Sequence, residues 1–311
     1  MNQPREPNSI QSTDSSETHL LNLSSLTHVR SLLQQYGLHT RKNLGQHFLV
    51  DQNILDAIVE AAELPGGGNT LEIGPGLGTL TRELAHHSGE VVAIEYDRML
   101  VNVLQDTLSA LENVKIVEAD ALRILRSEDV PALFEAPGAA ESPAISCVSN
   151  LPYNLTSPIL IALLERKHWF HSIVLMIQEE VADRLIAKPG TGQYGALTVF
   201  VQYHAHVEKS FTVGRQCFYP PPAVGSAVVK LTPLPDGAVP VEDPTRLFQV
   251  SRALFGQRRK TAANALMTLD GGKTRPEVMT AFEKAGIDAG RRGEQFSLEE
   301  MAALADAMGP G

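Results

Sequence analysis

The sequence predicts an α/β fold in which a parallel, doubly wound sheet is followed by a small all-α domain. Between residues 69 and 149, short apolar runs rich in Val and Ile alternate with stretches of helical period, which is typical of buried parallel strands joined by helices. Beyond a proline-rich break at 232–244, only helical periodicity continues. With 43% apolar and 20% charged residues, the composition is that of a globular protein.

The N-terminal part begins with a polar segment. Residues 1–25 are rich in Ser, Thr, Asn and Gln, and such a segment buries too little apolar surface to offset the entropy lost on ordering, so we expect a disordered tail. Helical patterns then begin at Leu26 and near Asp51. The predicted division is a disordered tail at 1–25, an α/β domain at 26–232, and a linker with a helical domain at 233–311.

Glycine- and proline-rich breaks separate the elements of the α/β domain. Short runs of β-branched residues predict strands, and apolar residues recurring every three to four positions predict helices. The stretch at 131–143 is predicted to be a surface insertion. The predicted strands are 69–73, 91–96, 114–118, 145–149, 173–178, 196–204 and 227–231, and the predicted helices between them are 79–87, 99–111 and 181–187.

Charge and cysteine content limit the function. The 26 basic and 36 acidic side chains give a formal charge of −10, which argues at first for a small-molecule enzyme and against a nucleic-acid binder. Cys147 and Cys217 lie in apolar runs, so we expect buried thiols in a reducing compartment. The polar N-terminus lacks the apolar core of a signal peptide, and no apolar run approaches the ~20 residues that span a bilayer. We therefore expect a cytoplasmic protein.

The end of the first sheet strand is a candidate ligand site. Gly74, Gly76 and Gly78 follow it, and glycines at a strand-to-helix turn let the backbone approach a ligand closely. Glu95 closes the second strand, where a carboxylate can accept hydrogen bonds from both ribose hydroxyls of an adenosine. Asp120 follows the third strand and either meets an adenine amino group or caps the next helix. These strand ends together predict an adenosine-containing cofactor, either NAD or S-adenosylmethionine.

The fourth strand ends in Asn150, Leu151, Pro152 and Tyr153, and this tetrapeptide decides between the two cofactors. An exocyclic amine on a purine is a poor nucleophile because its lone pair is delocalised. If the Asn150 side-chain oxygen and the Leu151 carbonyl accept its two N–H bonds, the nitrogen becomes more pyramidal and its lone pair points at the electrophile. Pro152 fixes the turn, and the Tyr153 ring can stack on the base. A plain Pro-Tyr turn is the alternative, but beside the other strand ends we favour methyl transfer.

These residues resemble the ribosomal RNA adenine dimethyltransferase family, and within it the bacterial enzymes that act on small-subunit rRNA. The resemblance extends from about residue 40 to residue 300. It implies a Rossmann-like class I S-adenosylmethionine-dependent methyltransferase fold with a small all-α C-terminal domain. The matching segments are 42–49, 72–78, 94–97, 150–154, 178–185, 194–197, 218–224, 226–229 and 255–261.

The resemblance implies transfer of methyl groups from S-adenosylmethionine to N6 of two adjacent adenosines near the 3′ end of 16S rRNA, giving N6,N6-dimethyladenosines during 30S maturation. Asn150, Leu151, Pro152 and Tyr153 are then the catalytic residues. The sulfonium is already a strong electrophile, so positioning suffices without a dedicated base. His47 stands where the family commonly has Asn, a harmless change if the contact is made through its backbone. The implied cofactor-binding residues are His47, Leu49, Gly74, Gly76, Glu95, Asp120 and Asn150.

The C-terminal domain offers a candidate RNA-binding surface. Residues 244–292 contain ten basic and four acidic side chains, against the acidic balance of the whole chain. Arg258, Arg259 and Lys260 form either a solvated helix face or, beside an adenine-modifying site, a set of phosphate contacts. We expect the partner to be 16S rRNA in the 30S subunit or its precursor, bound by a monomer without metal or membrane.

Other functions fit parts of the sequence. An Erm-type methyltransferase shares the fold and the Asn-x-Pro-Tyr motif but acts on large-subunit rRNA, and Gly74–Gly78 and Phe218–Pro222 favour the small-subunit enzyme. A DNA adenine methyltransferase would need a separate base-reading domain, and an NAD oxidoreductase would need a hydride-acceptor site, neither of which the sequence suggests. A ribosome-assembly factor that binds without catalysis would tolerate the loss of Asn150 and Tyr153.

Overall fold

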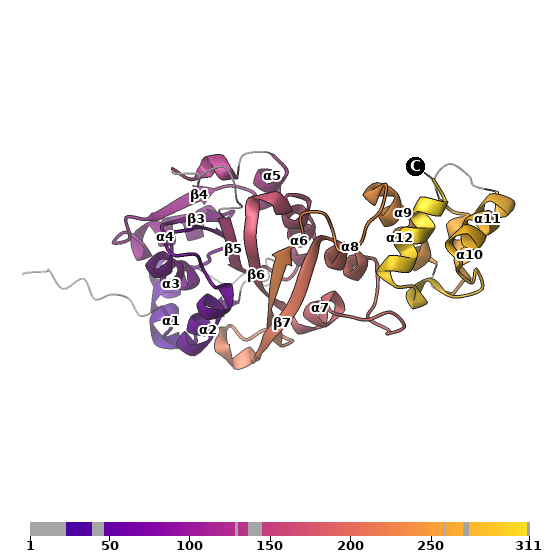
Figure 1. Ribbon diagram of the computed structural model, residues 1–311. Coiled ribbons are helices and arrows are strands. Elements are labelled where there is room, and N and C mark those ends of the chain that lie inside the picture. The colour runs from indigo at the N-terminus through magenta and orange to yellow at the C-terminus, as the bar shows by residue number, and fades with distance from the viewer. Residues whose placement is uncertain are drawn as a thin grey trace, which may run out of the picture.

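A mixed sheet forms the centre of the computed structural model, which describes residues 23–38, 47–127, 130–135, 145–257, 259–269 and 274–309. Its strands are β2 (Asn69–Ile73), β3 (Glu90–Glu95), β4 (Val114–Glu118), β5 (Ile145–Asn150), β6 (Phe170–Gln178), β7 (Ala205–Val213) and β9 (Ser226–Pro233). Within the described ranges, these seven strands pair in the order β4-β3-β2-β5-β6-β9-β7 (Figure 1). The first five are parallel, whereas β9 is antiparallel to both neighbours.

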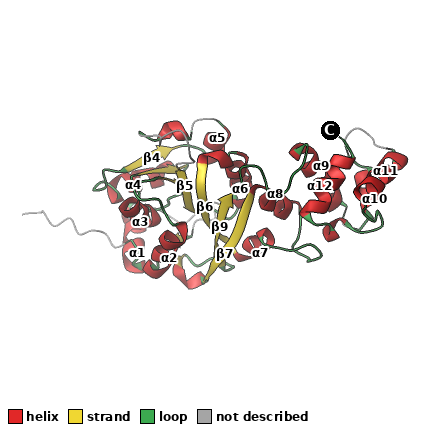
Figure 2. Cartoon of the chain, in the orientation of Figure 1, coloured by secondary structure: helices red, strands yellow, loops and turns green. Residues whose placement is uncertain are grey.

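Helices cover both faces of this sheet, as Figure 2 shows. Successive strand residues point to opposite faces, so the buried strands feed two apolar clusters. One cluster joins the sheet to α5 (Ala121–Arg126), α6 (Thr156–Glu165), α7 (Glu179–Leu185) and α8 (Ala196–His204). The other joins it to α2 (Gln52–Ala62) and α3 (Thr79–His87), while α4 (Arg98–Thr107) packs beside β3 and β4.

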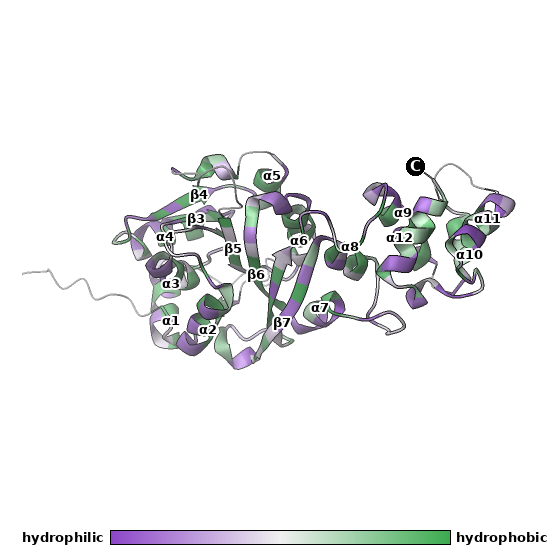
Figure 3. Ribbon diagram, viewed as in Figure 1, coloured by the Kyte–Doolittle hydropathy of each residue, from purple (hydrophilic) through white to green (hydrophobic). Residues whose placement is uncertain are grey.

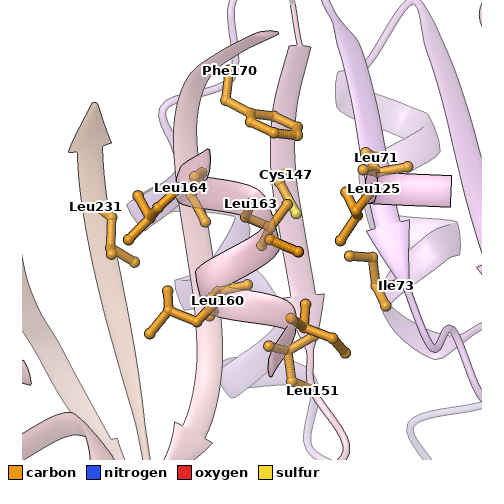
Figure 4. Close-up of a cluster of buried hydrophobic side chains, with 14 of the residues drawn as sticks. Leu71, Ile73, Leu125, Cys147, Leu151, Leu160, Leu163, Leu164, Phe170 and Leu231 are labelled. Carbon is orange, nitrogen blue, oxygen red and sulfur yellow. The ribbon is translucent and has the colours of Figure 1, made fainter. Parts of the chain in front are cut away.

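The first of these clusters shows how the doubly wound fold is held together. Leu71 and Ile73 of β2 and Cys147 of β5 are buried on one face of the sheet (Figure 4). Leu160 and Leu163 of α6 cover them and are themselves fully buried. Because both the strands and the helix are apolar where they meet, this packing stabilises the sheet and confirms the predicted α/β, Rossmann-like fold.

The C-terminal part is helical, as expected. It comprises α9 (Pro244–Gly256), α10 (Ala262–Leu266), α11 (Arg275–Ala285) and α12 (Leu298–Ala307), which lie together beyond α8 in Figure 1. Their apolar faces form a core of their own, distinct from the two clusters on the sheet. Figure 3 shows hydrophilic residues on the outer side of α11. Tyr194, Val199 and Tyr203 also belong to this core. The helical part is therefore packed directly against α8 rather than joined only by a linker.

The N-terminal segment is described from Leu23, which is buried against α1 (Leu26–Gln35). The expected tail at 1–25 is thus too long at its end, and residues 1–22 lie outside the described part. Two short strands that the sequence did not reveal, β1 (Phe48–Leu49) and β8 (Phe218–Tyr219), pair antiparallel. They tie the segment before α2 to the segment before β9.

The prediction of a strand at 196–204 is wrong, because these residues form α8. The run is largely apolar and rich in β-branched and aromatic side chains, so its composition does not separate a buried strand from a buried helix. Local capping separates them, since the Gly195 N–H donates to Oγ1 of Thr198 at 3.2 Å. The strand of this region, β7, begins at Ala205 instead.

The predicted surface insertion at 131–143 is also partly wrong. Within it, residues 131–133 form a short 3₁₀ helix, and Phe134 is buried against the core next to Val130. Residues 136–143 lie outside the described part.

Cys147 and Cys217 are free, buried thiols, as expected. The described helices include none long and apolar enough to cross a membrane. Further 3₁₀ helices lie at Lys167–Trp169, Arg215–Cys217 and Gly293–Gln295.

Candidate active site

A pocket opens at the carboxyl ends of β2, β3 and β5. This is the edge of a doubly wound sheet where ligands bind. The pocket brings together most of the residues selected in the sequence analysis, which come from segments far apart along the chain. Its lining includes His47, Leu49, Gly74, Gly76, Glu95, Asn150, Leu151, Pro152 and Tyr153.

The glycine loop after β2 is shaped as a close-approach turn. Gly74, Gly76 and Gly78 have φ angles of 71°, 62° and 83°, in the left-handed region that favours glycine. A Cβ atom on Gly76 would lie 3.2 Å from the ring of Phe48, a side chain that also lines the pocket. Gly76 is therefore packed too closely on Phe48 to carry a side chain, and it presents bare backbone in the pocket lining.

Glu95 braces this loop from the neighbouring strand. Its carboxylate is buried and accepts hydrogen bonds from the backbone N–H of Asp97 at 2.8 Å and of Gly76 at 3.4 Å. Burial raises the pKa of Glu95, and the backbone donors oppose that rise. Each carboxylate oxygen has a second lone pair, so Glu95 can hold the loop and still accept from a ligand hydroxyl.

Glu72 is a candidate binding residue that the sequence analysis included in the matching segment 72–78 without assigning it a role. It precedes the loop on β2, is 1% exposed and lines the pocket. Among the described residues its Oε2 atom has no hydrogen-bond partner. Burial raises the pKa of Glu72 to about 8, and nearby Glu95 adds to the shift. The Thr81 hydroxyl opposes this rise in pKa. A buried carboxyl oxygen without a hydrogen-bond partner is costly, so Oε2 of Glu72 is suited to a cationic group on a ligand.

The amide of Asn150 has a defined orientation. Its Nδ2 atom donates to the backbone carbonyl oxygen of His47 at 3.4 Å. The Oδ1 atom of the same amide is thereby left as the acceptor on the other side. The Leu151 N–H donates to Met176 at 3.1 Å, whereas its carbonyl oxygen accepts from no donor within the described ranges. Two acceptors are thus available at the end of β5.

Tyr153 stands beside these acceptors with its ring fixed at two places. Its hydroxyl is 2.7 Å from Oγ of Ser226, and its ring centroid lies 5.6 Å from that of His47 at an interplanar angle of 30°. Burial raises the pKa of Tyr153, so the phenol stays protonated at neutral pH. Ser226 lies 73 positions further along the chain, in the matching segment 226–229, to which the sequence analysis assigned no role.

His47 contributes through both its backbone and its ring. The Nδ1 atom is 2.7 Å from the carbonyl oxygen of Pro220, and because a carbonyl only accepts, Nδ1 carries the proton. Asn150 contacts the backbone of His47 rather than its ring. Having His instead of the usual Asn at position 47 therefore keeps the backbone carbonyl that Asn150 contacts. Leu49, the other residue of this segment, is buried in β1 opposite Phe218.

Two groups of predicted residues are not brought into the pocket lining. Asp120 is exposed and its Oδ1 accepts from the Leu122 N–H at 2.9 Å, which caps α5. Arg259 and Lys260 are exposed in the segment between α9 and α10, and Arg258 lies outside the described residues. For Asp120 the structure therefore supplies the capping role that the sequence left open, and the phosphate contacts stay a prediction.

Comparison with known sequences identifies close relatives. A family model described as ribosomal RNA adenine dimethylase matches residues 37–308. The chain is 44% identical over 283 residues to "Ribosomal RNA small subunit methyltransferase A" of Geobacillus thermodenitrificans, covering 90% of this chain and 95% of the relative. It is 45% identical over 274 residues to the protein of the same name from Moorella thermoacetica, covering 88% and 94%.

Solved structures agree with these relatives. A dimethyladenosine transferase from Plasmodium falciparum matches with a TM-score of 0.67 and 26% identity, covering 82% of this chain and 95% of that one. The 23S rRNA methyltransferase ErmE matches with a TM-score of 0.61 and 27% identity, covering 84% and 98%. Both similarities include the greater part of this chain.

Proposed function

This chain belongs to the ribosomal RNA adenine dimethylase family, and from that premise we propose that it dimethylates N6 of two adjacent adenosines near the 3′ end of 16S rRNA. The methyl donor is S-adenosylmethionine. The observation that carries the proposal is the orientation of Asn150: its Nδ2 is bound by the His47 carbonyl, so its Oδ1 is an acceptor beside the free carbonyl of Leu151. Two acceptors side by side suit an exocyclic NH₂ group.

The residues of the pocket fit the proposed cofactor. Glu72 has a buried, unpartnered oxygen that suits the cationic amino group of the methionine portion. The glycines of the loop present bare backbone in the lining, which lets a ligand approach it closely. Glu95 can accept from ribose hydroxyls, and Leu49 and His47 close the pocket on the side of β1. When bound, the cofactor supplies an electrophilic methyl group.

The chain's part in the reaction is to aim the amine and to exclude water. Hydrogen bonds from N6 to Asn150 Oδ1 and to the Leu151 carbonyl localise its lone pair and direct it away from both acceptors. Pro152 follows Leu151 and holds the turn that presents that carbonyl. The ring of Tyr153 stacks on the adenine once the base leaves the RNA stack. No side chain has to remove a proton before transfer, because the acidic proton appears only on the methylated amine.

The second methylation needs the same site with one contact fewer. After the first transfer, N6 carries a single N–H, so only Asn150 or Leu151 can accept from it. Both acceptors belong to the end of β5, and the Leu151 N–H is tied to Met176 on β6. A rigid strand end therefore keeps the remaining acceptor in position while the methyl group takes the place of the lost N–H.

RNA binding is proposed for the basic helical part, through Arg258, Arg259 and Lys260. These residues follow α9, which packs on α8 and so links them to the α/β part. Their phosphate contacts would make binding weaken steeply with salt. Replacing all three by Ala should lower RNA affinity and flatten that dependence in a filter-binding titration, and an unchanged titration would exclude this surface. The proposal has four further parts. The α/β part ends at residue 232 and the linker with the helical part begins at 233, and the protein is a monomer. Asp120 contacts the adenine, and the substrate is 16S rRNA in the 30S subunit or its precursor in the cytoplasm.

Large-subunit rRNA is the alternative substrate, because the structure also resembles ErmE. The named relatives at 44–45% identity are small-subunit enzymes, against 27% identity to ErmE. These identities favour the small subunit. The two possibilities differ in where the product is found, so the substrate assay separates them.

The proposal is tested with undermethylated 30S and 50S subunits and labelled S-adenosylmethionine. We expect label only in 16S rRNA, at two adjacent adenosines located by primer extension. Asn150→Ala should lose at least about 100-fold in methylation rate because the acceptor that aligns N6 is gone. The control, Asn53→Ala, removes an exposed asparagine of α2 and should keep the wild-type rate. Label in 23S rRNA, or a fully active Asn150→Ala variant, would contradict the proposal.

A further inference from the structure

We propose that Ser226 is a positioning residue for methyl transfer, which fixes the ring of Tyr153 before RNA binds. The inference rests on the proposed function, because Tyr153 is the residue assigned to stack on the target adenine. Ser226 itself is the first residue of β9, outside the tetrapeptide at the end of β5. The hydrogen bond between Tyr153 Oη and Ser226 Oγ joins β9 to the segment that follows β5.

Ser226 is held more firmly than a surface residue could be. It is fully buried, and its strand is paired on both sides. On one side it lies opposite Gln178 at the end of β6, and on the other side it lies opposite Val213 at the end of β7. Because backbone pairing on both sides prevents the strand from shifting, the hydroxyl is a fixed point against which another group can be located.

The bond to Tyr153 fixes the far end of the ring. The two hydroxyl oxygens are 2.7 Å apart, which is the usual length of an O–H···O bond. The near end of the side chain is set by the backbone turn after Pro152. With both ends located, the ring axis is determined, and only rotation about that axis remains.

The neighbouring imidazole limits that rotation. The ring of His47 lies 5.6 Å from the Tyr153 ring, tilted by 30°, and is itself bonded to the Pro220 carbonyl. Tyr153 is therefore located by Ser226 through its hydroxyl and by His47 through its ring. Such a ring does not have to be ordered when the base arrives, which avoids an entropy cost on binding and keeps the reacting atoms aligned.

The hydroxyl pair is tested by a double-mutant cycle with Ser226→Ala, Tyr153→Phe and the double variant, assayed on undermethylated 30S subunits. Each single change removes the same hydrogen bond, so each should lower kcat/KM for the RNA by about 10-fold through misplacement of the ring. The double variant should be no slower than the slower single variant, because the second change has nothing left to remove. The Kd for S-adenosylmethionine should stay at the wild-type value.

Ser172→Ala is the matched control, since Ser172 is also a buried strand serine but lies away from the pocket and bonds Ser146 and the Ala62 carbonyl. It should leave kcat/KM unchanged. Tyr153→Phe leaves β9 intact, so it reports on the bond even if Ser226→Ala fails to fold.

Additive effects of the two changes, or single variants as active as Ser172→Ala, would overturn the inference while the proposed function stood. A wild-type enzyme that makes no dimethyladenosine would instead overturn the proposed function, and the inference with it.

Discussion

The two walls of the pocket are built from different chemistry. One wall, here called the acidic wall, consists of Glu72, Glu95 and the loop Gly74–Gly78, with buried carboxylates over bare backbone. The other, the neutral wall, consists of His47, Asn150 and Tyr153, and Ser226, outside the lining, supports it through its hydrogen bond to Tyr153. The difference indicates a division of labour in which the acidic wall binds a cationic, hydroxyl-rich cofactor and the neutral wall aims an uncharged amine.

The strongest test of this comparison is Glu95→Ala. The change removes the acceptor for the Gly76 and Asp97 N–H groups together with the proposed ribose contact. We expect the Kd for S-adenosylmethionine to rise by about 100-fold, since several hydrogen bonds to a charged group are lost. Isothermal titration calorimetry measures the effect. Glu118→Ala is the control, because Glu118 is the exposed partner of Glu95 in the β3–β4 register. Equal Kd values for both variants would show that Glu95 does not contribute to cofactor binding.

Glu72 gives the acidic wall a pH dependence. Burial raises the pKa of Glu72 to about 8 from its usual value of 4.5, so the folded, ligand-free protein holds a proton there that the unfolded chain releases. The free energy of unfolding should therefore fall as pH rises from 4.5 towards 8, and Glu72→Gln should reduce that slope. Urea titrations across this range measure both slopes, and equal slopes would contradict the assignment.

Ligand binding should reverse the protonation of Glu72. A cationic amino group beside the carboxyl favours its ionised form, so binding of S-adenosylmethionine at pH 7 should release up to about one proton. Calorimetry in two buffers of different ionisation enthalpy detects this release. Its absence in the wild type, or its persistence in Glu72→Gln, would show that the amino group is bound elsewhere.

The smallest effect is expected at His47, on the neutral wall. Asn150 contacts the backbone carbonyl of this residue, which any side chain retains. His47→Asn should therefore preserve the amide orientation and lose only the ring contact to Tyr153 and the bond to Pro220. We expect the rate to fall by about 5-fold or less, since one hydrogen bond is worth about 1 kcal/mol. A 100-fold loss in a single-turnover assay would mean that the imidazole has a direct role.

Much of the acidic wall could be predicted from the sequence, because its residues lie at the ends of β2 and β3 and in the turn after β2. The predicted bounds of β2, α3 and β4 agree with the structure to the residue, and glycines mark both ends of β2 and the start of α3. Glu72 was assigned no role because a carboxylate inside a buried strand has no sequence signal separate from the strand itself. Its orphaned oxygen is visible only when its surroundings are known.

The neutral wall was less predictable, because its contacts join distant segments. Asn150 and Tyr153 were found through their tetrapeptide, but their partners His47 and Ser226 lie 103 and 73 positions away. Sequence spacing does not report which loop a strand end will meet. The prediction for 196–204 failed for a related reason, since a largely apolar run is compatible with either a strand or a helix until its packing partners are known.

The division between the walls is tested most directly by single-turnover methylation at saturating RNA, with the cofactor concentration varied over Glu95→Ala and Asn150→Ala. If the acidic wall binds and the neutral wall aims, enough S-adenosylmethionine restores the wild-type rate to Glu95→Ala. Asn150→Ala should saturate at the wild-type cofactor concentration but stay slow. Recovery of Asn150→Ala at high cofactor, or failure of Glu95→Ala to recover, would contradict this account.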